Sequence, residues 1–164
     1  MPFPPPVRPP TNHPVDVGTR SEAAVLLRLI DLGYDVLVPH GANHRYDLVL
    51  DQGDHLVRVQ CKTGRMRNGA IEFSPQSVRS NTKQVLTRPY DGEADYFAVY
   101  CRTNDGVYLI PCAEVTRGHN RLRLEPPANS QRKRIRWAGD YVLAKPERGL
   151  EPLHSRLQGE RSTN

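Results

Sequence analysis

The chain has 164 residues, a formal net charge of +5 and 25% charged residues. This length is typical of one domain with a single hydrophobic core. No apolar run is long enough to cross a membrane, and the amino terminus lacks the apolar segment of a secretory signal. The surplus of positive charge suits a polyanionic partner, although charge alone does not identify it.

The cysteines, Cys61, Cys101 and Cys112, are odd in number and show no Cys-x-x-Cys spacing. This pattern favours reduced thiols over a disulfide framework or a zinc site. We therefore expect a cytoplasmic protein without disulfide bonds.

Composition divides the chain into three parts. Residues 1–17 are rich in proline, which is typical of an extended, solvated arm. Residues 145–164 are polar and nearly featureless, and we expect them to form a disordered tail. The folded domain is therefore expected over residues 18–144.

The first predicted element is a helix over residues 20–33. Its apolar residues recur at helical spacing, and Gly33 is suited to end it. Glu22 lies at the head of this apolar stripe, which must pack on the rest of the protein. Two roles for Glu22 stay open: an active-site acid aimed at the ends of the strands, or the last residue of a capping box that begins at Thr19.

A series of short strands follows the helix. Gln52-Gly53 and Asn68-Gly69 are turn signals, and the second strongly favours a type I′ turn between paired strands. Residues 74–93 predict a loop with a short helix, and residues 129–144 match no clear pattern. The order of elements predicts an α/β (α+β) domain built on one mixed sheet. The strands are expected over residues 34–38, 46–50, 56–62, 70–73, 96–101, 107–110 and 121–124.

Three polar residues, Asp47, Gln60 and Lys62, interrupt the apolar strands 46–50 and 56–62. Such groups are costly to bury unless they are paired. Because side chains alternate along a strand, all three are expected to point away from the apolar face of their strands. They therefore form one polar group on one side of a predicted hairpin.

The loop between these strands decides how close the polar residues come. A two-residue loop at Gln52-Gly53 pairs Asp47 with Arg58 and leaves Asp47 diagonal to Gln60, at about 7–8 Å, within reach of one shared ion. The alternative for Asp47 is an ordinary ion pair with Arg58 or Arg45.

An acid, a second oxygen donor and a lysine are groups that phosphodiester hydrolysis uses. A metal must polarise the phosphate, a water must be activated, and a cation must stabilise the developing charge. Mg²⁺ takes hard oxygen ligands, commonly one or two carboxylates, with waters in the remaining positions. Asp47, the amide oxygen of Gln60 and a backbone carbonyl offer such ligands. Lys62 can orient the water or stabilise charge, although a strand lysine by itself is usually just solvated.

The order of these residues resembles the PD-(D/E)xK nuclease superfamily. Glu22 on a helix, then Asp47, then Gln60-Cys61-Lys62 match its motif, with QxK in place of (D/E)xK. The likeness continues through RYDLVL, RVQCKTGRMRNGAIEF, GEADYFAVYC and IRWAGDYVL, over about residues 16–144. The chain is similar in particular to the small homing endonucleases associated with group I introns and to their bacterial relatives.

This resemblance implies a metal-dependent endonuclease that hydrolyses phosphodiester bonds in double-stranded DNA. It also implies a restriction-endonuclease-like αβββαβ core with a central mixed β-sheet, and a homo-oligomer, either a dimer or a tetramer. Residue matching makes Glu22, Asp47, Gln60 and Lys62 the catalytic residues. Of these, Glu22, Asp47 and Gln60 would be ligands of Mg²⁺, for which Mn²⁺ would substitute.

Two departures from the family motif bear on the metal site. Tyr46 stands where the family often has proline, and Gln60 replaces an acid. A unit charge about 4 Å from the ion is worth about 4 kcal/mol at an effective dielectric of about 20. The loss either weakens metal binding or marks an inactive site, and the same QxK in the similar homing endonucleases favours the first.

Basic residues flank the proposed site. We expect them to position DNA phosphates, the alternative being an ordinary solvated face. The candidates are Arg65, Arg67, Arg79 and Lys83 in turn and loop segments, and Arg132, Lys133 and Arg134 in the densest basic run of the chain.

Three other functions stay open on the sequence. His40 and His44 suggest a histidine–metal nuclease, but two histidines without a third ligand make a poor zinc site. A structure-specific junction resolvase or repair nuclease would use the same core and would prefer branched to linear DNA. A catalytically dead DNA-binding module would keep the fold and lack metal-dependent cleavage.

Overall fold

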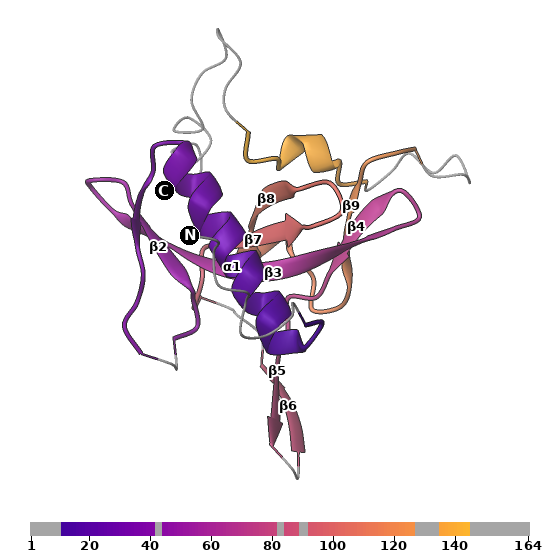
Figure 1. The fold of residues 1–164 in the computed structure, drawn as a ribbon, viewed down its shortest axis with the longest axis horizontal. Helices are drawn as coiled ribbons and strands as arrows, with labels where there is room; N and C mark the ends of the chain where they lie inside the picture. Colours follow the sequence, from indigo (N-terminus) through magenta and orange to yellow (C-terminus); the bar gives the residue numbers. More distant parts are fainter. Residues whose placement is uncertain (1–10, 42–43, 82–83, 89–91, 127–134, 145–164) are drawn as a thin grey trace, which may run out of the picture.

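The computed structural model describes residues 11–41, 44–81, 84–88, 92–126 and 135–144. A seven-stranded sheet carries one long helix, α1 (Pro14–Asp31), on one of its faces (Figure 1). The strands of this sheet are β1 (Asp35–Leu37), β2 (Leu48–Asp51), β3 (Leu56–Arg67), β4 (Ala70–Phe73), β7 (Tyr96–Cys101), β8 (Gly106–Pro111) and β9 (Asn120–Arg123). A separate hairpin is formed by β5 (Ser77–Asn81) and β6 (Gln84–Arg88), and two 3-10 turns are η1 (Cys112–Glu114) and η2 (Ala138–Asp140).

The long strand β3 organises the sheet. It pairs antiparallel with β2 near its start and with β4 at its end, and it pairs parallel with β7 in between. β8 pairs antiparallel with β7, and β9 adds to the outer edge of β4. The sheet is therefore mixed, which confirms the predicted fold class.

Two apolar clusters cover the two faces of the sheet. One packs α1 on the sheet, with Val25 and Leu29 of the helix against residues such as Val59 of β3. The other lies on the opposite face and includes Phe97 and Ile110. Because the middle of β3 is covered on both faces, Gln60, Lys62 and Thr63 are buried or half-buried, whereas Arg65 and Arg67 near its end are exposed.

The helix begins at Pro14 and not at the predicted residue 20. Pro14 stands in the first helical turn, where its missing N–H would have no partner within the helix, and the ring of His13 accepts a hydrogen bond from the N–H of Val15. Residues 14–17 of the predicted proline-rich arm thus lie in α1. One proline of that arm starts the helix.

The predicted capping box is wrong. Thr19 lies inside α1, where its hydroxyl donates to the carbonyl of Val15 at 3.0 Å. Glu22 is therefore a mid-helix residue, so the capping role is excluded and the role of an acid that faces the strands is left.

Residues 74–93 contain a hairpin where we predicted a loop with a short helix. β5 and β6 pair antiparallel from Ser77 opposite Arg88 to Asn81 opposite Gln84, and the hairpin projects from the sheet (Figure 1). Among the described residues, this hairpin stands where the αβββαβ order places its second helix. The segments SVRSN and QVLTR mix polar and apolar residues over too short a length to be told from a loop.

The remaining strands lie close to their predicted positions. β3 continues to Arg67, beyond its predicted end at Lys62, so that the turn Asn68-Gly69 connects it directly to β4. Both turn residues have positive φ (46° and 68°), as a type I′ turn requires. Within the described ranges, no helix is long and apolar enough to cross a membrane.

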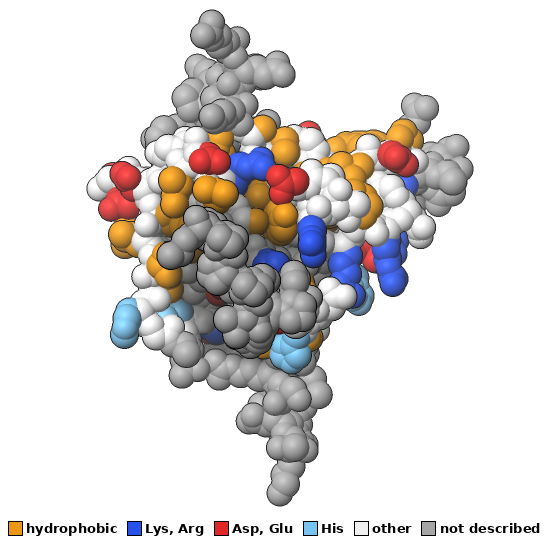
Figure 2. Space-filling view, viewed as in Figure 1, with side chains coloured by type: hydrophobic (Ala, Val, Ile, Leu, Met, Phe, Trp, Pro, Cys, Tyr) orange, Lys and Arg blue, Asp and Glu red, His pale blue; other side chains and the backbone are white. Residues whose placement is uncertain are grey.

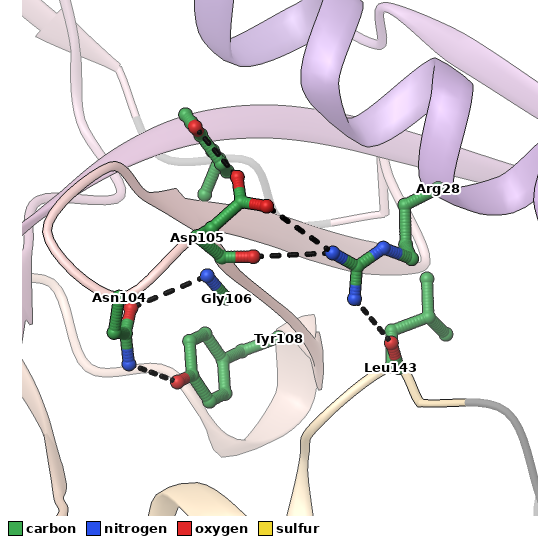
Figure 3. Close-up of polar contacts among 7 residues, drawn as sticks. Arg28, Asn104, Asp105, Gly106, Tyr108 and Leu143 are labelled. Carbon is green, nitrogen blue, oxygen red and sulfur yellow. Dashed lines mark hydrogen bonds and ion pairs between the residues drawn. The ribbon is translucent and has the colours of Figure 1, made fainter.

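The carboxyl-terminal half of α1 is fixed to the β7–β8 turn by Arg28 (Figure 3). Its guanidinium donates to the backbone carbonyls of Asp105 and Leu143 at 3.2 Å and 3.4 Å, and it forms an ion pair with the Asp105 carboxylate at 3.8 Å. The same carboxylate accepts a hydrogen bond from the hydroxyl of Tyr100 at 2.9 Å. One arginine therefore joins the helix, the turn and the end of the domain.

Candidate active site

The polar residues of the β2–β3 hairpin meet at the start of β2. β2 begins at Leu48, which lies opposite Val59. The N–H of Asp47, one residue earlier, also donates to the carbonyl of Val59 at 2.9 Å. This bond holds Asp47 against β3, beside Gln60.

The loop of this hairpin is longer than predicted, and this changes the register. Asp51 pairs with Leu56, so the loop contains the four residues 52–55 instead of two. The predicted pairing of Asp47 with Arg58 is therefore wrong. The correction brings Asp47 closer to Gln60 than the diagonal arrangement would have done.

The carboxylate of Asp47 is held by two donors from β3. Its Oδ2 accepts hydrogen bonds from the backbone N–H of Cys61 at 2.7 Å and from the side-chain amide of Gln60 at 2.5 Å. Burial raises the pKa of Asp47 above its ordinary value, while the Cys61 N–H, the charge of Lys62 and the Gln60 amide act in the opposite direction. The carboxylate is therefore fixed in place, and partial burial makes its charge costly.

A second carboxylate, that of Glu22, approaches Asp47 from α1. Burial raises the pKa of Glu22, and the negative charge of Asp47 raises it further. The neighbouring Ser21 is only 2% exposed, and its hydroxyl lies 2.7 Å from the hydroxyl of Thr63 on β3. This contact fixes the amino-terminal half of α1 on β3, one residue from Glu22 and one residue from Lys62.

Lys62 lies on the same face of β3 as Gln60. Its ammonium group is 6.0 Å from the ring centroid of Phe97 and donates to the carbonyl of Gln76 at 3.4 Å. Its charge lowers the pKa of Asp47. Lys62 is therefore held beside the carboxylate rather than extended into solvent.

Neither arginine that we considered as a partner of Asp47 binds it. Arg58 donates to the carboxylate of Asp95 through its Nε, Nη2 and backbone N–H, at 3.3, 3.2 and 2.8 Å. Arg45 forms an ion pair with Glu93. The ion-pair alternative for Asp47 is therefore wrong. The two arginines bind Glu93 and Asp95 instead, which lie much later in the sequence.

Two residues that fix the site, Ser21 and Asp95, were not predicted from the sequence. Ser21 occupies the same helical row as the buried Val25 and Leu29, at spacings of four, and a small polar residue in such a row could have been recognised as a contact point. Asp95 gives no local signal, because its partner Arg58 is 37 positions away.

The oxygen donors around Asp47 fit a hard divalent cation. Two carboxylates whose charges repel each other are stabilised by a cation between them, and Mg²⁺ needs only one or two carboxylates because it keeps several waters. With its nitrogen toward Asp47, the amide of Gln60 retains an oxygen as a further donor. In the part of the chain that the structure describes, no three His, Cys, Asp or Glu residues gather as a metal cluster. The His44 ring instead contacts the carbonyl of His40 at 3.0 Å.

The candidate DNA contacts are spread over several segments. Arg65 and Arg67 are exposed at the end of β3, and Arg79 belongs to β5. The other candidates lie outside the described residues, namely Lys83, Arg132, Lys133 and Arg134.

Comparisons with known proteins bear on this arrangement. The family model described as PD-(D/E)XK endonuclease matches residues 12–144. The solved structure of the bacterial homing endonuclease I-Ssp6803I is 22% identical with a TM-score of 0.67, covering 93% of this chain and 100% of that one. The Holliday junction resolvase Hjc of Archaeoglobus fulgidus is 18% identical with a TM-score of 0.38, covering 65% of this chain and 83% of that one. No curated protein sequence matches.

Proposed function

Because the chain belongs to the PD-(D/E)XK endonuclease family, we propose that it is a metal-dependent endonuclease that hydrolyses phosphodiester bonds in double-stranded DNA. The observation that carries the proposal is the meeting of Glu22, Asp47, Gln60 and Lys62, which come from a helix and two strands. The similarity in fold to a homing endonuclease agrees with cleavage at specific duplex sites.

In this proposal each side chain has a separate task. Glu22, Asp47 and the amide oxygen of Gln60 hold Mg²⁺, for which Mn²⁺ substitutes. When bound, the ion polarises the scissile phosphate and lowers the pKa of a water molecule. Lys62, placed beside Asp47 by its contacts with Phe97 and Gln76, orients that water or stabilises the charge that develops on the phosphate.

Gln60 has a second task, which is to orient Asp47. Its amide and the backbone N–H of Cys61 both bind the same oxygen, Oδ2, which leaves the other oxygen of the carboxylate for the metal. A glutamine at this position thus offers one ligand oxygen and restrains another ligand. This supports an active QxK site over a dead one.

The proposal is tested by incubating the full chain with supercoiled plasmid and a pool of duplex DNA, with Mg²⁺, Mn²⁺ or EDTA, and sequencing the ends. We expect cleavage with Mg²⁺ and Mn²⁺ and none with EDTA. Cleavage of branched but not linear DNA would move the protein to the junction-resolvase alternative. DNA binding without cleavage under any of these conditions would leave the non-catalytic alternative.

We also propose that the active species is a homo-oligomer, a dimer or a tetramer. One chain carries one set of the four residues, which is enough to cut one strand. Two antiparallel strands are cut together most simply when a two-fold axis supplies a second site.

A further inference from the structure

The strands β3, β4 and β9 form a three-stranded arm with an unusual row of arginines. Arg65 lies opposite Glu72, and Glu72 lies opposite Arg121 on β9. Two residues along, Arg67 lies opposite Ala70, and Ala70 lies opposite Arg123. Four arginines from two strands that are far apart in sequence thus occupy two neighbouring rows.

These rows face away from the core of the arm. Between them, Met66 lies opposite Ile71, and Ile71 lies opposite Leu122, and all three pack in the apolar cluster of the opposite face. Because side chains alternate across a sheet, the arginines point to the other side. Arg65, Arg67 and Arg121 are exposed. Figure 2 shows Lys and Arg side chains gathered on the part of this face where the arm lies.

The charges within the arm do not cancel. Glu72 is the one acid in the two rows, and Arg121 contacts it through Nε at 2.8 Å while its own side chain stays 64% exposed. Arg123 donates to the carbonyls of Asn68 and Glu125 at 3.0 Å and 3.2 Å, so it braces the turn. Arg65, Arg67 and Arg121 are left as outward cations held on a rigid surface.

We propose that this face of the arm, with Arg65, Arg67 and Arg121, binds the phosphate backbone of duplex DNA beside the cleavage site. The inference rests on the proposed function. Three strands are about 10 Å wide between the outer backbones alone, and the major groove, about 12 Å wide, admits only a two-stranded ribbon. The arm therefore lies along the backbone and positions the duplex rather than reading its bases.

The arm is continuous with the proposed site. Arg65 follows Lys62 on the same strand by about 10 Å, but the two side chains point to opposite faces of β3. Arg65 shares its face with Thr63, which contacts Ser21 beside Glu22. The arginine rows therefore adjoin the proposed site on its α1 side, next to Glu22.

The experiment measures binding of a fluorescein-labelled 30-base-pair duplex by anisotropy, in EDTA, over a range of salt concentrations. Each lost phosphate contact lowers the steepness of log K against log[salt] by about 0.9, so the double variant Arg65→Gln/Arg121→Gln should lose about 1.8. The matched controls are single changes: Arg121→Gln should lower the slope by about 0.9, and Arg102→Gln, which removes an exposed charge from the β7–β8 turn, should keep the wild-type slope. Glu72→Gln should bind more tightly than wild type, because it removes the one acid of the two rows and releases Arg121 from its ion pair.

The outcomes separate this inference from the proposed function. A lower slope in the double variant with an unchanged control supports the arm, whether or not the protein cleaves DNA. A wild-type slope in the double variant and in Arg121→Gln, equal to that of Arg102→Gln, overturns the arm and leaves cleavage untouched. If the double variant does not fold, Glu72→Gln decides, and unchanged or weaker binding overturns the inference. A wild-type protein that binds no duplex overturns both.

Discussion

At the scale of single residues, the site is centred on Asp47. Its position beside Gln60 gives it two donors from β3, and burial together with the charge of Asp47 raises the pKa of Glu22 on α1. The resulting group of acids is unfavourable for the metal-free protein and suits a cation. The proposed metal-binding role of these acids is therefore opposed to the stability of the metal-free protein.

We predict that Asp47→Ala and Lys62→Ala each lower the cleavage rate by at least about 100-fold, as the loss of other charge-stabilising groups does. Neither side chain belongs to an apolar cluster, so the variants should fold. The measurement is single-turnover cleavage of plasmid in Mg²⁺, with circular dichroism to check folding. Asp35→Ala, which removes an exposed strand carboxylate, is the control and should cut normally. Wild-type cutting by either site variant would remove the residue assignment.

We predict that Glu22→Gln raises the melting temperature at pH 8 in EDTA and leaves it unchanged at pH 4. The folded-state pKa of Glu22 is raised, so its contribution to stability is present while it is protonated and is lost as the pH rises through that pKa. Glutamine stays neutral and avoids the loss. Added Mg²⁺ should stabilise the wild type more than the variant. Equal melting temperatures of Glu22→Gln and the wild type at both pH values would mean that neither burial nor the charge of Asp47 raises the pKa of Glu22.

At the scale of elements, the helices and strands that were predicted correctly are those with a clear local sequence pattern. The strands 70–73 and 96–101 were found within their observed bounds, because a strong turn signal or a long apolar run marked them. The start of α1 was predicted too late because the prolines before residue 18 indicated an extended arm. The sequence Thr19-x-x-Glu22 also matches a capping box, although it lies inside the helix. The β5–β6 hairpin was missed because its segments are short and polar.

The candidate site was predictable in its members but not in its geometry. The motif named Glu22, Asp47, Gln60 and Lys62, whose order along the chain carries the family likeness. Their distances depend on the length of the β2–β3 loop, where Gln52-Gly53 looked like a two-residue turn. The loop closes instead by a hydrogen bond from the N–H of Gln52 to the carbonyl of His55 at 3.0 Å. The length of this loop is set by the register of β2 and β3 along their whole length, which the local sequence does not reveal.

We predict that Gly64→Ala destabilises the fold by about 1–3 kcal/mol, the usual cost of overpacking. A Cβ there would lie 2.6 Å from a methyl carbon of Ile71 and 2.8 Å from one of Val99, where β3 passes over the second apolar cluster. Gly18→Ala in α1 is the control. Nothing lies within 4 Å of its Cβ, and alanine should stabilise the helix by about 0.5–1 kcal/mol. Urea unfolding of both variants measures the change in the free energy of unfolding. A Gly64→Ala protein as stable as wild type would show that Ile71 and Val99 can make room for the added methyl group.

At the scale of the whole molecule, one face of the sheet is covered by α1, and the helix is attached at both ends. Ser21 contacts Thr63 near its start, and Arg28 contacts the β7–β8 turn near its end. The helix therefore moves with the sheet as one body. Assembly is expected to occur between such rigid units.

We predict that the protein in solution is at least a dimer, because concerted cutting of both strands needs two sites. Light scattering with and without DNA measures the mass, and the products of a supercoiled plasmid report how many strands are cut in one encounter. Linear product at early times is expected. A monomer that only produces nicked circles would contradict the oligomer and favour a repair nuclease.

The four-residue loop at 52–55 has a consequence for how such a protein can evolve. Surface loops ordinarily accept insertions and deletions with little effect. Here a shift of one residue in pairing would turn Asp47 to the other face of the sheet. A lineage could thus lose its nuclease by a change in loop length alone, with every residue of the motif still in the gene. Searches that count motif letters would record such a descendant as an intact enzyme.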